Sequence, residues 1–146
     1  MSIDQEKYKN LGFNKYLIGH LANYRSEHVL GYRCEPPYNI LGSPLSGRNI
    51  FPLWERGITA VYFNYDSKKF EVCSLEDIDD IWLSVDSAQG ILAYLLLQLM
   101  EDEHSDQEIS LVGKLIGFTY INELLKGANQ AEDYCSWSEG FPQQCS

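Results

Sequence analysis

The amino-acid sequence predicts a single α+β domain, in which helices pack on an antiparallel sheet that contains a β-hairpin. The chain has 146 residues, a common length for one domain, and 45% of them are hydrophobic, as in folded globules. A run rich in β-branched and aromatic residues has a hairpin pattern, and strands and helices do not alternate as βαβ units. We therefore expect one domain over residues 1–146.

The N-terminal third predicts a helix, a strand and a loop. Apolar residues recur at near-helical spacing over 13–25, with Asn14 available as a cap near the start. Residues 28–35 are followed by two prolines, a pattern typical of a strand that ends where proline removes a ladder donor. The stretch 38–52 is rich in glycine and proline, so we expect it to be mainly loop.

The hairpin is the clearest β pattern. Residues 58–65 are rich in β-branched and aromatic side chains, residues 66–67 have turn chemistry, and residues 69–73 resume the alternation. An acidic connection over 74–80 follows and leads to Trp82.

A buried helix is expected after this connection. Asp86 and Ser87 offer N-cap side chains to a helix that runs to about Met100. Apolar side chains occur on nearly every face of this segment, so it must be largely surrounded by other parts of the protein.

The C-terminal region predicts helices and then a tail. Ser105 and Glu108 match a capping box, in which the two side chains satisfy each other's backbone donors at a helix start. Gly117 is a candidate break in the apolar stripe, which continues helically over 121–127. Residues 128–146 are polar, and we expect a C-terminal tail that is a candidate for flexibility.

The charge of the chain is unevenly distributed. Residues 1–70 carry nine basic and six acidic side chains, a net of +3, whereas residues 71–146 carry two basic and fifteen acidic ones, a net of −13. Binding to phosphates needs clustered Lys and Arg, so we expect no direct contact with nucleic acid. The asymmetry suits a basic protein partner; the alternative is an acidic surface that only keeps the protein in solution.

No residue pattern indicates catalysis, a cofactor or a metal. The chain has no GxSxG elbow and no phosphate-binding glycine loop, and nothing pairs its histidines with a nucleophile. The acidic alternation from Asp102 to Glu108 lacks the central glycine of a calcium loop and overlaps the capping box. We therefore expect a protein that is not an enzyme; an enzyme without a sequence motif ranks last among the alternatives.

The four cysteines show no metal-site spacing. Residues 1–10 lack the basic start and apolar stretch of a secretory signal, and the longest apolar run, 90–100, is too short to cross a bilayer. We expect a cytoplasmic protein with free thiols and no membrane association. A bridge between Cys135 and Cys145, which lie in the same terminal stretch, is the rival interpretation.

Two acidic groups are candidates for partner binding. The first is interleaved with Trp82 and consists of Glu71, Glu76, Asp77, Asp79, Asp80 and Asp86. The second consists of Glu101, Asp102, Glu103, Asp106 and Glu108. Interfaces commonly combine an aromatic anchor with a charged rim, so we expect the partner to contact Trp82 and the acids from Glu76 to Asp86. The alternative is a solvated surface with Trp82 in the core.

A family resemblance covers about half of the chain, from Phe51 to Met100. The segment FPLWERGITAVYFNYDSKKFEVCSLEDIDDIW, followed by SVDSAQGILAYLLLQLME, resembles members of the SUKH superfamily. Its bacterial representatives are largely immunity proteins encoded beside polymorphic or contact-dependent toxins. The resemblance implies a cytoplasmic, non-enzymatic α+β protein that binds one toxin domain tightly. Together with the charge, it predicts an immunity protein whose cognate toxin is basic and nuclease-like; the alternative is an adaptor or regulatory protein-binding module.

Overall fold

Four antiparallel strands, in the order β1–β2–β3–β4, form the sheet of this protein. In the computed structural model, which describes residues 2–146, they are β1 (Ile50–Arg56), β2 (Thr59–Asn64), β3 (Lys69–Ser74) and β4 (Asp77–Val85). Seven α-helices accompany this sheet within the described residues. The expected α+β class, with helices packed on an antiparallel sheet in one domain, is confirmed.

The β2–β3 hairpin forms as predicted. Its register is regular, and Asn64 pairs with Lys69 at the closed end. The side-chain oxygen of Asn64 accepts a hydrogen bond from the backbone N–H of Asp66 at 2.9 Å, a local bond that favours a turn. Lys68 takes a positive φ of 56° in the same turn.

β1 lies at one edge of the sheet and contains a proline. The register shifts between Pro52 and Trp54, so Leu53 is an extra residue at a β-bulge. Edge strands and bulges are the places where a sheet accepts proline, because a ladder donor is not needed there. The hydroxyl of the buried Tyr8 donates to the carbonyls of Pro52 and Leu53, which satisfies groups that the bulge removes from the ladder.

The N-terminal segment forms two short helices where one was predicted. α1 (Gln5–Asn10) is too short for a periodic apolar pattern, and Tyr8 is its one buried residue. α2 (Lys15–Ala22) lies inside the predicted range and begins after Asn14, whose side chain accepts from the backbone N–H of Leu17 at 3.1 Å. The expected cap is therefore confirmed, although the helix ends earlier than predicted.

The strand expected over 28–35 is wrong. This segment contains a short 3-10 helix, η1 (Gly31–Arg33), and Gly31 has a φ of 36° that an extended strand does not allow. Glu35 alone makes a β-bridge, with Glu55 of β1. The two prolines that follow thus end a turn rather than a strand.

The stretch 38–52 is more ordered than the loop we expected. It contains α3 (Tyr38–Leu41), a second 3-10 helix, η2 (Pro44–Gly47), and the first residues of β1. The buried carboxylate of Glu55 accepts from the backbone N–H groups of Asn39 and Ile40, so a strand residue rather than a local cap starts α3. Sequence patterns do not report such a distant cap.

α4 (Ala88–Glu101) is the central helix, as predicted. Ser87 is its N-cap and accepts from the backbone N–H of Gly90. Nine of its fourteen residues are buried, which confirms the expectation drawn from its apolar character on nearly every face.

Two further helices follow the predicted pattern. α5 (Asp106–Leu115) begins at the capping box, in which Ser105 and Glu108 exchange two hydrogen bonds of 3.1 Å. Gly117 ends this helical stretch with a φ of 82°. α6 (Ile121–Gln130) then continues the apolar stripe.

A helix occupies most of the segment 128–146, where we expected a tail. α7 (Tyr134–Gln144) is capped by Asp133, which accepts from the backbone N–H of Ser136 at 3.2 Å. Phe141 is buried in the main core. A few buried apolar side chains are enough to attach a polar helix to the core, and the polar composition of the segment does not reveal them.

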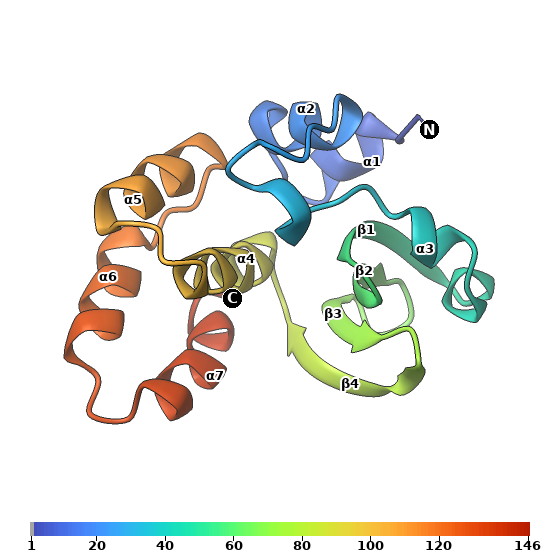
Figure 1. Cartoon of the computed structure of the whole chain (residues 1–146). Helices are drawn as coiled ribbons and strands as arrows, with labels where there is room; N and C mark the ends of the chain where they lie inside the picture. The colour runs from blue at the N-terminus through green and yellow to red at the C-terminus, as the bar shows by residue number, and fades with distance from the viewer. Residues whose placement is uncertain (1) are drawn as a thin grey trace.

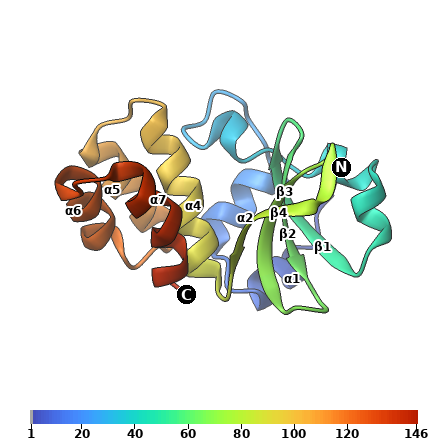
Figure 2. The same ribbon diagram turned by 90° about the horizontal axis from the view of Figure 1, so that it is seen from below.

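α4 separates the two halves of the molecule. Figures 1 and 2 show α5, α6 and α7 on one side of α4 and the sheet on the other, with α1 and α2 beside the sheet. The main hydrophobic core joins α4 to the helices and to one face of the sheet. A smaller cluster under α3 and η2 covers the opposite face and consists of Ile40, Leu45, Ala60, Tyr62 and Cys73.

None of the helices within residues 2–146 combines the length and the apolar character that a bilayer-spanning segment requires.

Candidate functional site

Trp82 projects from a second β-bulge, in the edge strand β4. Val72 pairs with Leu83 and Cys73 pairs with Ile81, so Trp82 is the extra residue. Successive strand residues normally point to opposite faces of a sheet. The bulge relaxes this rule, and both Trp82 and Leu83 turn toward α4 and α7, where they line the same groove. Leu83 is buried, whereas 55% of Trp82 remains exposed.

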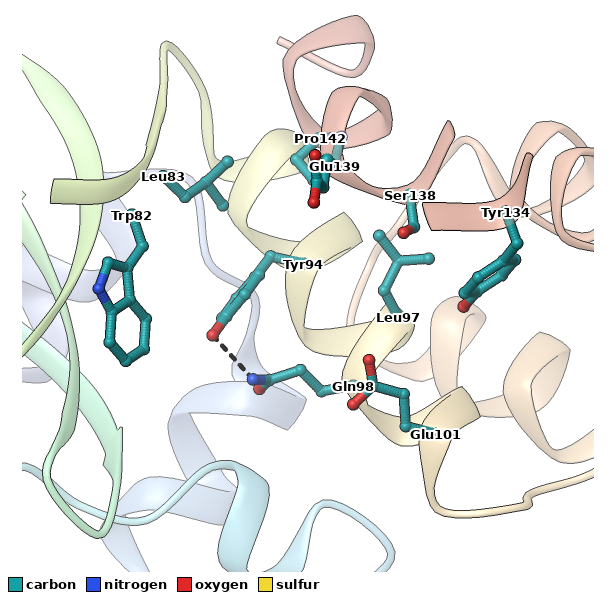
Figure 3. A pocket seen from close by; sticks show the side chains of 10 residues that line it. All are labelled: Trp82, Leu83, Tyr94, Leu97, Gln98, Glu101, Tyr134, Ser138, Glu139 and Pro142. Atoms are coloured by element: carbon teal, nitrogen blue, oxygen red, sulfur yellow. Dashed lines mark hydrogen bonds between the residues drawn. The ribbon is translucent and has the colours of Figure 1, made fainter. Parts of the chain in front are cut away.

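One face of α4 forms the floor of this groove. Tyr94, Leu97, Gln98 and Glu101 contribute to it, and their spacing of three, four and seven residues puts them on one side of the helix. The amide nitrogen of Gln98 donates to the hydroxyl of Tyr94 at 2.7 Å (Figure 3). This bond orients the tyrosine ring, which is partly buried against the main core.

α7 forms the remaining wall because it approaches α4 closely. A Cβ atom at Gly90 of α4 would lie 2.8 Å from the carbonyl oxygen of Pro142, so only glycine permits this contact. The side-chain hydroxyl of Ser87 donates to the carbonyl of Cys145 at 3.3 Å and joins the start of α4 to the end of α7. The far end of α7 places Tyr134, which is 37% exposed, beside the groove.

We call this hollow the β4–α4–α7 groove; its volume is about 350 Å³. Figure 3 shows Trp82 at one end, Tyr134 at the other, and the α4 side chains between them. It is lined by Trp82, Leu83, Tyr94, Leu97, Gln98, Glu101, Tyr134, Ser138, Glu139 and Pro142. This volume is in the lower part of the range for small-molecule pockets, which run from about 300 to 1,000 Å³, and the groove is open along its length.

The charge in the groove is negative. Among the described residues that line it, Glu101 and Glu139 are the two that carry a charge. Burial raises the pKa of Tyr94 to about 12, with Glu101 adding to the rise and the positive charges of Arg33 and Arg56 opposing it. Burial also raises the pKa of Tyr134, and Glu101 contributes again. The hydroxyls of Tyr94 and Tyr134 are therefore protonated at neutral pH and can donate hydrogen bonds, and the carboxylate of Glu101 acts on both.

Glu101 keeps an accessible carboxylate although an arginine lies near it. Arg33 of η1 approaches Glu101 at 3.9 Å. Its short bonds go to Asp102, at 2.9 Å from Nε and 2.7 Å from Nη2. The groove side of Glu101 therefore remains available to a cationic ligand.

The predicted partner-binding residues are divided between the groove and other parts of the surface. Of the six, Trp82 alone lines the groove. Asp79 accepts from Arg48 at 2.7 Å and lines a different hollow, on the side of the sheet that carries η2. Asp86 accepts from Lys69 at 2.7 Å and lies between β4 and α4. Within the predicted acidic group, these two carboxylates are already paired with basic side chains.

The remaining three acids lie along β4 and the turn before it. Glu76 belongs to the β3–β4 turn, and Asp77 and Asp80 are exposed on the strand. The acidic connection expected over 74–80 is therefore wrong in its second half, because β4 begins at Asp77. Cys73 of β3 pairs with Ile81 of β4, and the next residue, Ser74, pairs with Asp77. The residues of β4 between Asp77 and Ile81 are therefore unpaired with β3 and form a bulge, which interrupts the alternation of buried and exposed side chains.

Several residues of the groove were missed by the sequence argument. Glu101 belonged to the second acidic group, and Glu139 and Tyr134 fell in the expected tail. The spacing of Tyr94, Leu97 and Glu101 on one helix face was visible in the sequence, but a helix that is apolar nearly all round does not reveal which face stays open. The approach of α7 depends on Gly90, which no periodic pattern identifies.

Two of the three histidines, His20 and His28, lie next to each other. His20 is buried, and its Nε2–H donates to the carbonyl of Cys34 at 2.7 Å. Its ring lies 4.8 Å from that of His28, whose Nδ1 accepts from the backbone N–H of Leu30 at 3.1 Å. Within residues 2–146, no three His, Cys, Asp or Glu side chains gather in a way that would hold a metal ion.

Comparisons with family models, with curated proteins and with solved structures gave no significant match.

Proposed function

We propose that this protein is an immunity protein that binds and neutralises a cognate bacterial toxin domain of basic, nuclease-like character. The observation that carries the proposal is the exposed Trp82, which the bulge in β4 holds at the mouth of a groove whose charged residues are both acidic. A large aromatic side chain beside an open groove is a frequent anchor of protein–protein interfaces.

The charge distribution supports a basic partner. The half of the chain that contains β4, α4 and α7 has a net charge of −13. The exposed carboxylates of Glu76, Asp77 and Asp80 lie on the strand and turn that lead to Trp82. Such a field raises the rate at which a positively charged protein arrives, and a few desolvated anchors then set the lifetime of the complex.

The resemblance of residues 51–100 to the SUKH superfamily supports the same proposal. It implies a cytoplasmic protein that acts by covering a toxin surface and uses neither a cofactor nor a catalytic residue. In this proposal the toxin contacts the groove and the acids beside it. The adaptor alternative predicts binding to a partner without rescue from a toxin.

The first experiment is co-expression with the product of the adjacent upstream gene as the candidate toxin, scored by growth rescue and by co-purification. Rescue together with a stable complex is the expected result. A stable complex without rescue would favour the adaptor, and the absence of both would remove the proposal.

Association kinetics then test the acidic surface. Glu76, Asp77 and Asp80 changed together to Lys should slow association with the toxin by about tenfold or more, because steering raises on-rates by roughly 10 to 10³. These positions leave the Asp79–Arg48 and Asp86–Lys69 pairs intact. The wild-type on-rate should fall as salt rises, and the triple variant should respond much less.

A charge-matched control separates local steering from net charge. Glu6, Glu123 and Glu132 are exposed and lie outside the groove, so their change to Lys alters the net charge equally. This variant should retain most of the wild-type on-rate. Equal losses in the two variants would show that the β4 acids have no special place in recognition.

A further inference from the structure

We infer that the β4–α4–α7 groove receives an arginine side chain of the partner, with its guanidinium held by aromatic rings and by Glu101. This inference rests on the proposed function, because it takes the partner to be a basic protein. It adds the kind of side chain that enters and the residues that hold it.

The aromatic side chains of the groove suit a flat cation. Trp82, Tyr94 and Tyr134 come from three different elements and bound the hollow from its two ends and its floor. A cation over an aromatic face is attracted by the ring quadrupole, and tryptophan is the strongest partner. The buried Leu97 between the rings offers apolar contact for the methylene stem.

The charge of the lining selects a cation over other ligands. Glu101 and Glu139 approach the groove from α4 and α7, and no basic side chain is among the described residues that line it. The nearby Arg33 is held by Asp102 through two hydrogen bonds and does not occupy the groove. An acidic ligand would be repelled, and a purely apolar one would make no use of the two carboxylates.

Arginine fits this arrangement better than lysine. Its guanidinium is planar, so one face can stack on an aromatic ring while its edge donates two hydrogen bonds to a carboxylate. It is also less strongly hydrated than an ammonium, and loses less on leaving water. The groove presents rings and carboxylates from different directions, which matches a ligand with distinct faces and edges.

The test uses short peptides, so it does not require the toxin. The full chain, labelled with ¹⁵N, is titrated at low salt with acetyl-Gly-Arg-Gly-amide and with the citrulline peptide, which has the same shape without the charge. The indole signal of Trp82 should shift with saturation at millimolar peptide, and the citrulline peptide should bind about tenfold more weakly. The indole of Trp54, which is buried and has no partner among residues 2–146, should not move.

Matched variants locate the site. Glu101→Gln keeps the shape of the side chain and should weaken the arginine peptide by about threefold to tenfold, and Trp82→Leu should weaken it similarly. Glu6→Gln removes one exposed charge on α1, outside the groove, and should leave the affinity unchanged. Equal binding of the two peptides, or equal effects of Glu101→Gln and Glu6→Gln, would overturn the inference.

Toxin binding to the same variants separates this inference from the proposed function. A toxin that binds Trp82→Leu and Glu101→Gln as tightly as the wild type would overturn the groove as its arginine site, and would leave the immunity function standing. Specific arginine binding in the groove without any toxin complex would overturn the immunity function alone.

Discussion

The guanidinium of Arg33 donates to both carboxylate oxygens of Asp102, at 2.9 Å and 2.7 Å. Arg33 is 7% exposed. The pair joins η1, near the N-terminus, to the residue that ends α4, and it thereby ties the segment before the sheet to the floor of the groove. The hydrogen bonds from Arg33 hold the pKa of the Asp102 carboxyl below its ordinary value.

We predict that Asp102→Asn lowers the free energy of unfolding by roughly 1.5–3 kcal/mol, because it leaves a buried guanidinium without its charged acceptor. Chemical denaturation at pH 7 measures this loss. The Asp102 pKa is lower in the folded than in the unfolded chain, so the contribution is present above the ordinary Asp pKa and is lost as pH falls through the folded value. The difference between wild type and variant should therefore shrink in acid.

Glu27→Gln provides the control for this prediction. Glu27 pairs with Arg25 at 3.0 Å, but both side chains are exposed. Its denaturation midpoint should stay at the wild-type value, since exposed pairs are screened by water. Equal midpoints for Asp102→Asn and the wild type would show that the Arg33 bonds are of the same weak kind.

The contact between α6 and α7 depends on Gly127. A Cβ atom at this position would lie 2.2 Å from two ring carbons of Trp137, which is too close for any relaxed structure. We predict that Gly127→Ala displaces the indole and destabilises the protein by about 1–3 kcal/mol, as overpacking does. Tryptophan fluorescence during urea unfolding reports both effects.

Gly140→Ala is the matched change on α7. Nothing lies within 4 Å of its added Cβ atom, so the helix should gain about 0.5–1 kcal/mol from the better propensity of alanine. Opposite signs for the two substitutions are expected. A stabilised Gly127→Ala variant would mean that α7 does not pack on α6 in the way described.

His20 makes the stability depend on pH near neutrality. Burial lowers the pKa of its imidazole, the hydrogen bond to the Cys34 carbonyl partly opposes this, and His28 lowers it further. The unfolded chain therefore binds more protons than the folded one just below pH 6.5, and stability must fall as pH drops from there through the folded pKa. The ring of Tyr24 lies edge-on to that of His20, with 5.5 Å between the ring centroids, and the hydroxyl of Tyr16 is hydrogen-bonded to His28. Two basic residues, Lys15 and Arg25, line the hollow beside His20.

We predict that His20→Gln flattens the pH dependence of the melting temperature between pH 7 and pH 5, although it lowers the melting temperature itself. Comparison with the wild type cancels the carboxyl groups that titrate at lower pH. A wild-type slope in the His20 variant would assign the pH dependence to other groups.

The thiols should react very unequally. Cys135 is exposed, whereas Cys34, Cys73 and Cys145 are buried. Burial raises the pKa of the Cys145 thiol to about 11, which further lowers its reactivity. Titration with a thiol reagent should modify one cysteine in the native protein and four after unfolding. Rapid modification of Cys145 in the native protein would contradict the packing of α7.

The geometry of α7 also disfavours the Cys135–Cys145 bridge. Ten residues of α-helix separate the two cysteines by about 15 Å, and a disulfide needs Cα atoms within roughly 7 Å. The bridge could form only if α7 unwound, and mass spectrometry after alkylation should find both residues reduced.

The sequence predicted the elements that are determined by residues close together in the chain. The β2–β3 hairpin has turn residues between alternating strands, α4 has a cap and a continuous apolar run, and α5 has a capping box. Each of these features lies within a few residues in the chain. Propensity and periodicity therefore suffice to find them.

The elements that were missed depend on distant partners. β1 contains a proline that only its edge position and bulge make acceptable, and the bulges of β4 erase the alternation that would mark a strand. α3 begins at a carboxylate from β1. The groove was missed for the same reason, because three elements form it, and the sequence indicated only Trp82 and Glu101 among its members, in two separate groups.

The position of β4 at the end of the sheet has a consequence for self-association. The outer edge of a terminal strand offers unpaired backbone groups to any other extended chain, and such edges seed aggregation. The exposed carboxylates of Asp77 and Asp80 disfavour pairing with an identical edge from a second molecule, and the bulges prevent a flat, continuous template. Neutral, β-prone residues at these positions would make the same strand a better template for aggregation, so the acids favour a dispersed protein independently of any role in binding.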